Sequence, residues 1–369
     1  MSKPIFVARP SLPPIEEYLP FLEEIWRSKV LSNGGHFHQR LESELALYLG
    51  VEHLSLFSSG TAALLLALRA LGVEGDVITT PYSFAATANA LVWNNLNPIF
   101  VDIDRKTLNI DPRAIEEAIT DRTTAILGVH CYGNPCDVAE IERIAYRNNL
   151  KVIYDAAHAF SVEDSGGSVL RHGDMAVVST HATKVFNTFE GGIVVCKTAA
   201  HKEQLDRLKN FGFEDPVTIN TPGLNGKMSE VSAALGLVQL RHVGRYIEER
   251  KGIHDRYKNE FSGIKDINVF DYKEDVRPNF SYFPIFIAAK STTRTQGVLE
   301  KMAESNIHCR RYFHPLISNF PYFRNQLNVA SPGTPNALSV SNEVLCMPIY
   351  SDMTDEEINK ICSTLKAAL

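Results

Sequence analysis

The sequence predicts an α/β fold in which an open, largely parallel sheet is followed by a smaller second domain. Three observations lead to this prediction. Short apolar runs rich in β-branched residues recur along the chain, helical patterns lie between them, and the pattern changes after about residue 245. Strands that alternate with helices favour a parallel sheet with helices on both faces. We therefore expect a large domain over residues 1–245 and a small domain over residues 246–369.

Seven runs in the first domain are expected to be strands, because they are short, apolar and rich in β-branched residues. They are His53–Phe57, Val77–Thr80, Pro98–Asp102, Ala125–Val129, Val152–Asp155, Ala176–Ser179 and Ile193–Val195.

Helical segments are expected between these strands. Thr61–Leu71 is rich in Ala and Leu and is followed by Gly72, which commonly ends a helix. Asp111 before Pro112 is an N-cap pattern, and Asp137 starts an amphipathic stretch that runs to Asn148. Near the N-terminus, Glu16–Lys29 is predicted to be a helix that fits against either domain.

The second domain is expected to combine a small sheet with covering helices. A long charged helix is predicted at its start, followed by two strands and two further helices. The helices are Arg245–Phe261, Thr292–Ser305 and Thr354–Ala368, and the strands are Phe280–Ala288 and Ile307–Tyr312.

The composition describes an ordinary globular protein and excludes several classes of function. The 369 residues are 44% hydrophobic and 22% charged, with a net charge of −6, which argues against broad nucleic-acid binding. The longest apolar stretch, near Ala62–Ala67, is far shorter than the roughly 20 residues that span a bilayer. Met1–Pro4 lacks the layout of a signal peptide. We expect a cytoplasmic protein with neither nucleic-acid nor membrane partners.

The cysteines are expected to be buried, reduced thiols. Six cysteines in a chain of this length do not form a disulfide framework. Cys131 and Cys136 lie beside His130, but their spacing is not a usual zinc spacing. We therefore expect no metal site.

Polar groups follow several of the predicted strands, at the sheet edge where open α/β sheets bind ligands. Ser58–Ala63 places Gly60 at a helix start, where free N–H groups and the helix dipole favour an anion, and Thr61 adds a hydroxyl donor. Asp155 ends an apolar strand, where a carboxylate is costly unless it meets a positive partner such as a protonated pyridine nitrogen. His158, three residues on, is placed to reach a second polar group of the same ring.

A lysine and an aromatic residue complete the pattern. Lys184 follows a buried strand and a hydroxyl-rich turn, where a lysine can have a depressed pKa and form a Schiff base. Ser179 and His181 suit a phosphate, and Phe84 suits stacking on a flat ring. Each of these segments alone also fits a simpler role. Ser58–Ala63 fits a plain helix cap and Asp155 fits a residue that caps a turn. Lys184 fits a solvated surface lysine, and Phe84 fits core packing. Taken in this order, they describe a pyridoxal phosphate site.

The chain also resembles, over nearly its whole length, the DegT/StrS family of nucleotide-sugar aminotransferases. The segments that carry the resemblance are Gly34–Gly35, Pro81–Ala90, Val101–Asp104, Asp155–Ala159, His181–Lys184 with Glu190–Gly192, and Gly223–Glu230. The resemblance implies the fold type I (aspartate aminotransferase-like) architecture. This architecture has a large cofactor-binding domain with a mainly parallel seven-stranded sheet and a smaller C-terminal α/β domain.

The resemblance implies pyridoxal 5′-phosphate as cofactor, with pyridoxamine 5′-phosphate as its aminated form. Lys184 stands at the Schiff-base position, Asp155 at the pyridine nitrogen, and His158, where many members have Gln, at the phenolic oxygen. Asn225 matches a residue that reaches the phosphate in the partner subunit, which implies a homodimer with two shared sites. The other implied cofactor contacts are Gly60, Thr61, Ala62, Phe84, Ser179 and His181.

The resemblance also implies the substrates. L-Glutamate is the usual amino donor of the family. The run 181–192 is similar to enzymes that aminate carbon 4 of dTDP-4-keto-6-deoxyglucose, and amination at carbon 3 or of a UDP-linked sugar is the alternative. The intact Lys184 disfavours both a related sugar dehydratase, in which His replaces the lysine, and a non-catalytic regulator. The candidate substrate contacts are Lys29, Lys227, Arg310, Arg311, Tyr312 and His314.

Overall fold

A seven-stranded sheet forms the centre of the computed structural model, which describes residues 3–288, 292–326 and 333–369. The strand order is β2-β10-β9-β6-β5-β3-β4. Strand β10 pairs antiparallel with both of its neighbours, and the remaining pairs are parallel, which confirms the predicted mainly parallel sheet. The strands are β2 (Leu54–Phe57), β3 (Asp76–Thr79), β4 (Asn97–Phe100), β5 (Thr123–Val129), β6 (Lys151–Asp155), β9 (Met175–Ser179) and β10 (Gly192–Cys196).

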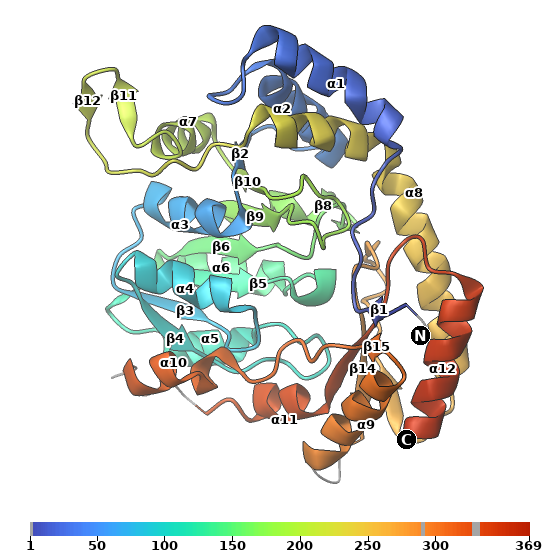
Figure 1. Cartoon of the computed structure of the whole chain (residues 1–369). Helices are drawn as coiled ribbons and strands as arrows, with labels where there is room; N and C mark the ends of the chain where they lie inside the picture. The colour runs from blue at the N-terminus through green and yellow to red at the C-terminus, as the bar shows by residue number, and fades with distance from the viewer. Residues whose placement is uncertain (1–2, 289–291, 327–332) are drawn as a thin grey trace.

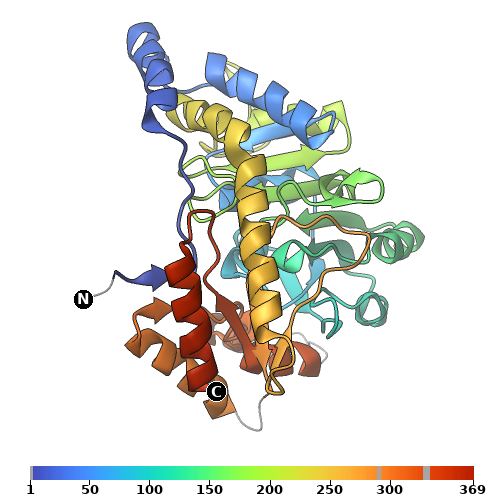
Figure 2. The same cartoon turned by 90° about the vertical axis from the view of Figure 1, so that its right-hand side faces the viewer.

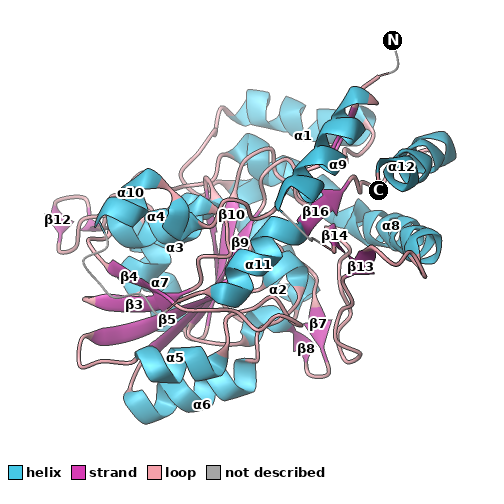
Figure 3. Ribbon diagram, turned by 90° about the horizontal axis from the view of Figure 1, so that it is seen from below, coloured by secondary structure: helices cyan, strands magenta, loops and turns pink. Residues whose placement is uncertain are grey.

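Helices cover both faces of this sheet (Figures 1 and 3). On one face, residues such as Val77, Val177 and Val194 pack against α3 (Gly60–Ala70), α4 (Ala85–Trp93) and α7 (Ala199–Leu208). Their chain neighbours point to the opposite face, because side chains alternate along a strand. That face packs against α2 (His36–Leu49), α5 (Pro112–Ala118), α6 (Val138–Asn148) and the first half of α8 (Glu230–Phe261).

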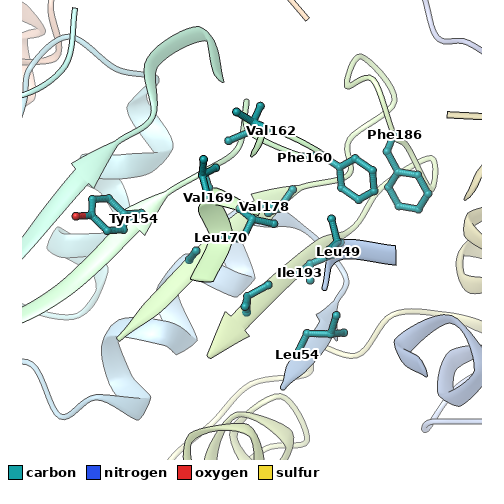
Figure 4. Close-up of a cluster of buried hydrophobic side chains, with 14 of the residues drawn as sticks. Leu49, Leu54, Tyr154, Phe160, Val162, Val169, Leu170, Val178, Phe186 and Ile193 are labelled. Carbon is teal, nitrogen blue, oxygen red and sulfur yellow. The ribbon is translucent and has the colours of Figure 1, made fainter. Parts of the chain in front are cut away.

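Part of the second face is shown in Figure 4. Val178 of β9 and Ile193 of β10 belong to the same buried cluster as Phe160 and Phe186, whose rings stack with their centroids 4.4 Å apart. Burial on both faces explains why these strands are apolar throughout instead of alternating between apolar and polar residues.

The helix caps expected from the sequence are present. The side chain of Asp111 accepts the N–H of Arg113 at the start of α5, and Asp137 accepts the N–H of Glu140 at the start of α6. The N-terminal helix α1 (Ile15–Ser28) packs on the first half of α8, where the Tyr18 hydroxyl donates to the carbonyl of Val231 at 2.8 Å.

The helix predicted from Arg245 begins earlier than expected. Helix α8 starts at Glu230 and runs for 32 residues, and the Ser229 side chain caps its N-terminus. Its first half packs against the large sheet, whereas Ile253, Tyr257 and Phe261 belong to a second core. Figure 2 shows α8 crossing much of the molecule. Residue 245 therefore lies within a continuous helix, and the domain boundary there remains a prediction.

The second core contains a three-stranded antiparallel sheet of β13 (Ile267–Val269), β14 (Phe283–Ile287) and β16 (Val344–Met347). Helices α9 (Thr292–Glu304) and α12 (Asp355–Ala368) pack against it, and they confirm the two helices predicted there.

The strand predicted over Ile307–Tyr312 is wrong for most of its length. Strand β15 covers Ile307–His308 alone and pairs in parallel with β1 (Ile5–Phe6). After a single bridge from Arg310 to Cys346, the carbonyl of Tyr312 accepts hydrogen bonds from side-chain hydroxyls. Side-chain bonds of this kind replace the backbone ladder that would have continued the strand.

Shorter elements complete the described structure. The hairpin of β11 (Phe213–Asp215) and β12 (Thr218–Ile219) projects from the body of the molecule in Figure 1. The others are β7 (Glu163–Asp164), β8 (Gly167–Ser168), α10 (Pro321–Gln326), α11 (Pro335–Glu343) and the 3₁₀ turns η1 (Cys131–Gly133), η2 (Val169–Arg171) and η3 (Ile317–Asn319).

Three further findings concern membranes, metals and cysteines. Among the residues that the structure describes, no helix has the length and apolar character needed to cross a bilayer. Within the same residues, no group of three or more His, Cys, Asp or Glu side chains could hold a metal ion. All six cysteines are buried free thiols.

Candidate active site

A cavity of about 360 Å³ lies at the carboxyl ends of β6 and β9. Nine of the residues predicted from the sequence line it: Gly60, Thr61, Phe84, Asp155, His158, Ser179, His181, Lys184 and Tyr312. Seven others lie outside its lining: Lys29, Ala62, Asn225, Lys227, Arg310, Arg311 and His314. Segments that are distant in the sequence therefore meet at the sheet edge where the strand pattern predicted a ligand.

The N-terminus of α3 forms one wall of the cavity. The N–H of Ala62 donates to the Ser59 hydroxyl at 3.1 Å, whereas the N–H groups of Gly60 and Thr61 precede the first intrahelical bond. A Cβ added to Gly192 would lie 2.6 Å from the Ser59 carbonyl oxygen, so only glycine lets β10 pass this close. The result is a helix start with free N–H groups, which is suited to an anion.

Asp155 ends β6, and its carboxylate is buried among neutral hydrogen-bond donors. It accepts the Thr87 hydroxyl at 2.7 Å and the N–H of Ala157 at 3.1 Å, and Thr87 in turn pairs with the Ser83 hydroxyl at 2.7 Å. Burial raises the pKa of Asp155, while these hydrogen bonds and the charge of Lys184 oppose the shift. A cationic group bound in the cavity would stabilise a carboxylate buried in this way.

Lys184 lies on the loop between β9 and β10, with its amine at the cavity. The amine donates to the Tyr282 hydroxyl at 3.2 Å. Burial lowers the pKa of Lys184 to about 8, against the opposing charge of Asp155. The loop is held by the buried side chains of Thr180 and Thr188, whose hydroxyls lie 2.7 Å apart. Lys184 is thus a preorganised amine with a substantial neutral fraction near pH 8.

His158 is a buried, neutral hydrogen-bond donor. Its Nδ1 accepts the N–H of Tyr132 at 3.2 Å, so the proton of the neutral ring resides on Nε2. Burial and the charge of Lys184 lower the pKa of His158 well below its ordinary value, which keeps the ring uncharged at neutral pH. The imidazole therefore offers an N–H without adding a positive charge to the cavity.

Two residues that contact the predicted site residues, Thr87 and Tyr282, were not singled out by the sequence analysis. Thr87 lay inside the segment Pro81–Ala90, and its position one helical turn after Ser83 was a usable signal for their hydroxyl pair. Tyr282 lies 98 residues beyond Lys184, and nothing in the local sequence linked the two.

Several predicted substrate contacts are engaged elsewhere in the single chain. The Arg311 guanidinium donates to the carbonyls of Ser341 and Asn342 in the last turn of α11, and His314 pairs with the Ser341 hydroxyl. The Lys227 amine donates to the Asn210 side chain. Lys29 and Arg310 are exposed. Their roles at a substrate, like that of Tyr312, remain predictions.

Comparison with known proteins gives consistent results along the whole chain. The model of the DegT/DnrJ/EryC1/StrS aminotransferase family matches residues 15–366. A dTDP-4-amino-4,6-dideoxy-D-glucose transaminase of Shigella dysenteriae is 51% identical over 366 residues, which cover 99% of both chains. An enzyme of the same name from Escherichia coli is 48% identical, with coverage of 99% of this chain and 98% of its own. A crystal structure of DesI with its TDP-sugar product superposes with a TM-score of 0.94 at 32% identity, over 100% of this chain and 93% of that chain.

Proposed function

This chain belongs to the DegT/DnrJ/EryC1/StrS aminotransferase family, and on that premise we propose that it transfers an amino group from L-glutamate to dTDP-4-keto-6-deoxy-D-glucose, with pyridoxal 5′-phosphate as cofactor. The proposed product is dTDP-4-amino-4,6-dideoxy-D-glucose. One observation carries the proposal. Lys184, Asp155 and His158 share a cavity in a chain that is 51% identical, over almost its full length, to a transaminase named for this product.

The described residues fit pyridoxal 5′-phosphate on physical grounds. The N-terminus of α3 and the Ser179 hydroxyl suit the phosphate, and the buried Asp155 carboxylate suits a protonated ring nitrogen. The neutral His158 suits the phenolic oxygen as a donor. When bound, this cofactor supplies an electron-accepting ring and an aldehyde that carries amino groups.

The chain's own groups divide the remaining tasks. The Asp155 carboxylate would hold a proton on the ring nitrogen of the bound cofactor, because it is buried and its hydrogen-bond donors, the Thr87 hydroxyl and the Ala157 N–H, are neutral. With the cofactor bound, the Lys184 amine, whose pKa is lowered to about 8, would take the α-proton of the amino donor onto Nζ and leave the electron pair of that C–H bond to the cofactor ring. It would then release the proton from Nζ to the exocyclic carbon of the cofactor. The Thr87 hydroxyl fixes the orientation of the Asp155 carboxylate.

The proposal includes a homodimer with shared active sites and a cytoplasmic location. Asn225 is exposed and lies outside the cavity of its own chain, as expected for a residue that acts in the partner. Apolar side chains are exposed on and beside the nearby β11–β12 hairpin, which supports an interface there. They are Phe211, Phe213, Val217 and Ile219.

Replacing Asn225 by alanine tests the shared site. We expect the dissociation constant of the cofactor to rise by about 10- to 100-fold, because one hydrogen bond to an anionic phosphate is lost. The measurement is cofactor titration by absorbance or calorimetry. Asn148→Ala is the control, because Asn148 lies on α6, outside the cavity and the hairpin, and bonds the Ile144 carbonyl of its own helix; its cofactor affinity should be unchanged. Unchanged cofactor affinity in Asn225→Ala would contradict the shared site.

The reaction itself is tested by incubating the purified protein with L-glutamate and dTDP-4-keto-6-deoxy-D-glucose. We expect one 2-oxoglutarate for each amino sugar formed, and NMR of the product should show nitrogen on carbon 4. Nitrogen on carbon 3, or turnover with a UDP-linked sugar alone, would replace the proposed substrate. Consumption of the sugar without 2-oxoglutarate would identify a dehydratase instead.

A further inference from the structure

We propose that Tyr282 is a positioning residue that fixes the direction of the Lys184 amine. The inference rests on the proposed function, in which Lys184 carries the proton of the transfer. It extends that function because it assigns a role at Lys184 to Tyr282, which lies next to the three-stranded sheet.

The contact joins two distant parts of the fold. Lys184 lies on the loop between β9 and β10 of the large sheet, whereas Tyr282 immediately precedes β14 of the three-stranded sheet. Nζ of Lys184 lies 3.2 Å from the hydroxyl oxygen and 5.8 Å from the centre of the ring. The amine is therefore bound by the hydroxyl, and the face of the ring contributes less.

The Tyr282 ring is held from several sides, so its hydroxyl has a defined place. The His158 ring lies 4.4 Å away and the Tyr132 ring 5.6 Å away, measured between centroids. The Tyr312 ring meets it edge-on at 5.8 Å. A hydroxyl on a ring packed in this way orients a neighbouring amine better than a mobile side chain does.

The charges around the amine define the role of the phenol. Asp155 faces Lys184 across the cavity, and His158 is neutral. On the Lys184 loop, His181 pairs with Glu190 at 3.5 Å. Burial raises the pKa of Tyr282, and the buried Arg250 of α8 opposes this shift only in part.

The phenol therefore stays protonated at working pH and acts as a hydrogen-bond partner, not as a base. It accepts an N–H from the ammonium form of Lys184 and can donate its O–H to the neutral amine. In both protonation states Nζ is held in one direction.

The first test measures the amine without the cofactor reaction. In the full-length, cofactor-free protein, acetylation of Lys184 by acetic anhydride is followed against pH by peptide mass spectrometry. We expect the midpoint for Tyr282→Phe to fall by about half a unit to one unit, because both hydrogen bonds are lost and the bond to the charged amine is the stronger of the two. Tyr272→Phe is the matched control, since its hydroxyl donates to the Tyr132 carbonyl in the same aromatic cluster. Its midpoint should equal that of the wild type.

The second test uses the loaded enzyme. We expect kcat of Tyr282→Phe to fall by about 10- to 100-fold, with the KM for glutamate within a factor of two, because a misplaced amine slows the proton step and leaves binding intact. An unchanged labelling midpoint, or a lowered midpoint with unchanged kcat, would overturn the positioning role.

The two proposals can fail independently. If the wild type shows no amino transfer, the proposed function fails, while the labelling result still reports on the contact between Tyr282 and Lys184. If the wild type transfers amino groups and Tyr282→Phe equals it in both tests, only the positioning role fails. Tyr282→Leu repeats both tests should the phenylalanine variant not fold.

Discussion

Replacing Lys184 by alanine is expected to lower the rate of amino transfer by about 10³-fold or more, because the variant loses the amine that takes up and returns the transferred proton. No other lysine is among the residues that line the cavity in the described part of the chain. The fold should be retained, since the Lys184 backbone N–H bond to the His181 carbonyl does not involve the side chain. The measurement is single-turnover formation of 2-oxoglutarate from glutamate.

Lys197→Ala is the matched control for this experiment. Lys197 is an exposed lysine just after β10 and outside the cavity, and its loss should leave the rate unchanged. The Lys184 variant should also lose the covalent attachment of the cofactor to the chain, which intact-mass measurement after borohydride reduction detects in the wild type. Persistence of both the attachment and the turnover would show that another amine acts.

The large sheet could be predicted from the sequence because each strand is buried on both faces. A run such as Ala125–Val129 is apolar throughout, so it can be recognised as a strand even when the strands beside it in the sheet are unknown. The start of α8 could not be found in this way. Its first half, which includes Ala233, Ala234 and Leu237, is buried between α1, α2 and the sheet, and so it lacks the charged face by which the second half was recognised.

The candidate site was predictable where its residues follow strands. Asp155 and Ser179 end adjacent strands of the sheet, so their proximity follows from the α/β pattern once the two strands are neighbours. Contacts between distant segments that are not neighbours in one sheet carry no such signal. The Tyr282 hydroxyl bonds Lys184, and the Arg311 guanidinium donates to the Ser341 carbonyl near the end of α11. Both contacts depend on tertiary packing, which the local sequence does not encode.

Replacing Asp155 by asparagine is expected to lower amino transfer by about 10²- to 10³-fold, which is typical for the loss of one buried electrostatic group at a reacting centre. Asparagine has nearly the same shape and can still accept the Thr87 hydroxyl, but it brings no negative charge to hold a proton on the ring nitrogen. Steady-state kinetics measures the loss. Asp164→Asn is a control in a partly buried cluster outside the cavity, where the carboxylate pairs with Arg171 and His172, and it should leave the rate unchanged.

The same substitution should have the opposite effect on the stability of the cofactor-free protein. The pKa of Asp155 is raised in the folded state, so the folded protein binds this proton more tightly than the unfolded chain does. Stability is therefore lost as pH rises from the ordinary carboxyl pKa, about 3.9, through the folded value. The neutral amide of the variant does not titrate and carries no such loss. We expect the thermal midpoint of Asp155→Asn to match the wild type in acid and to exceed it at neutral pH. A variant that is less stable than the wild type at neutral pH would show instead that the carboxylate serves the fold.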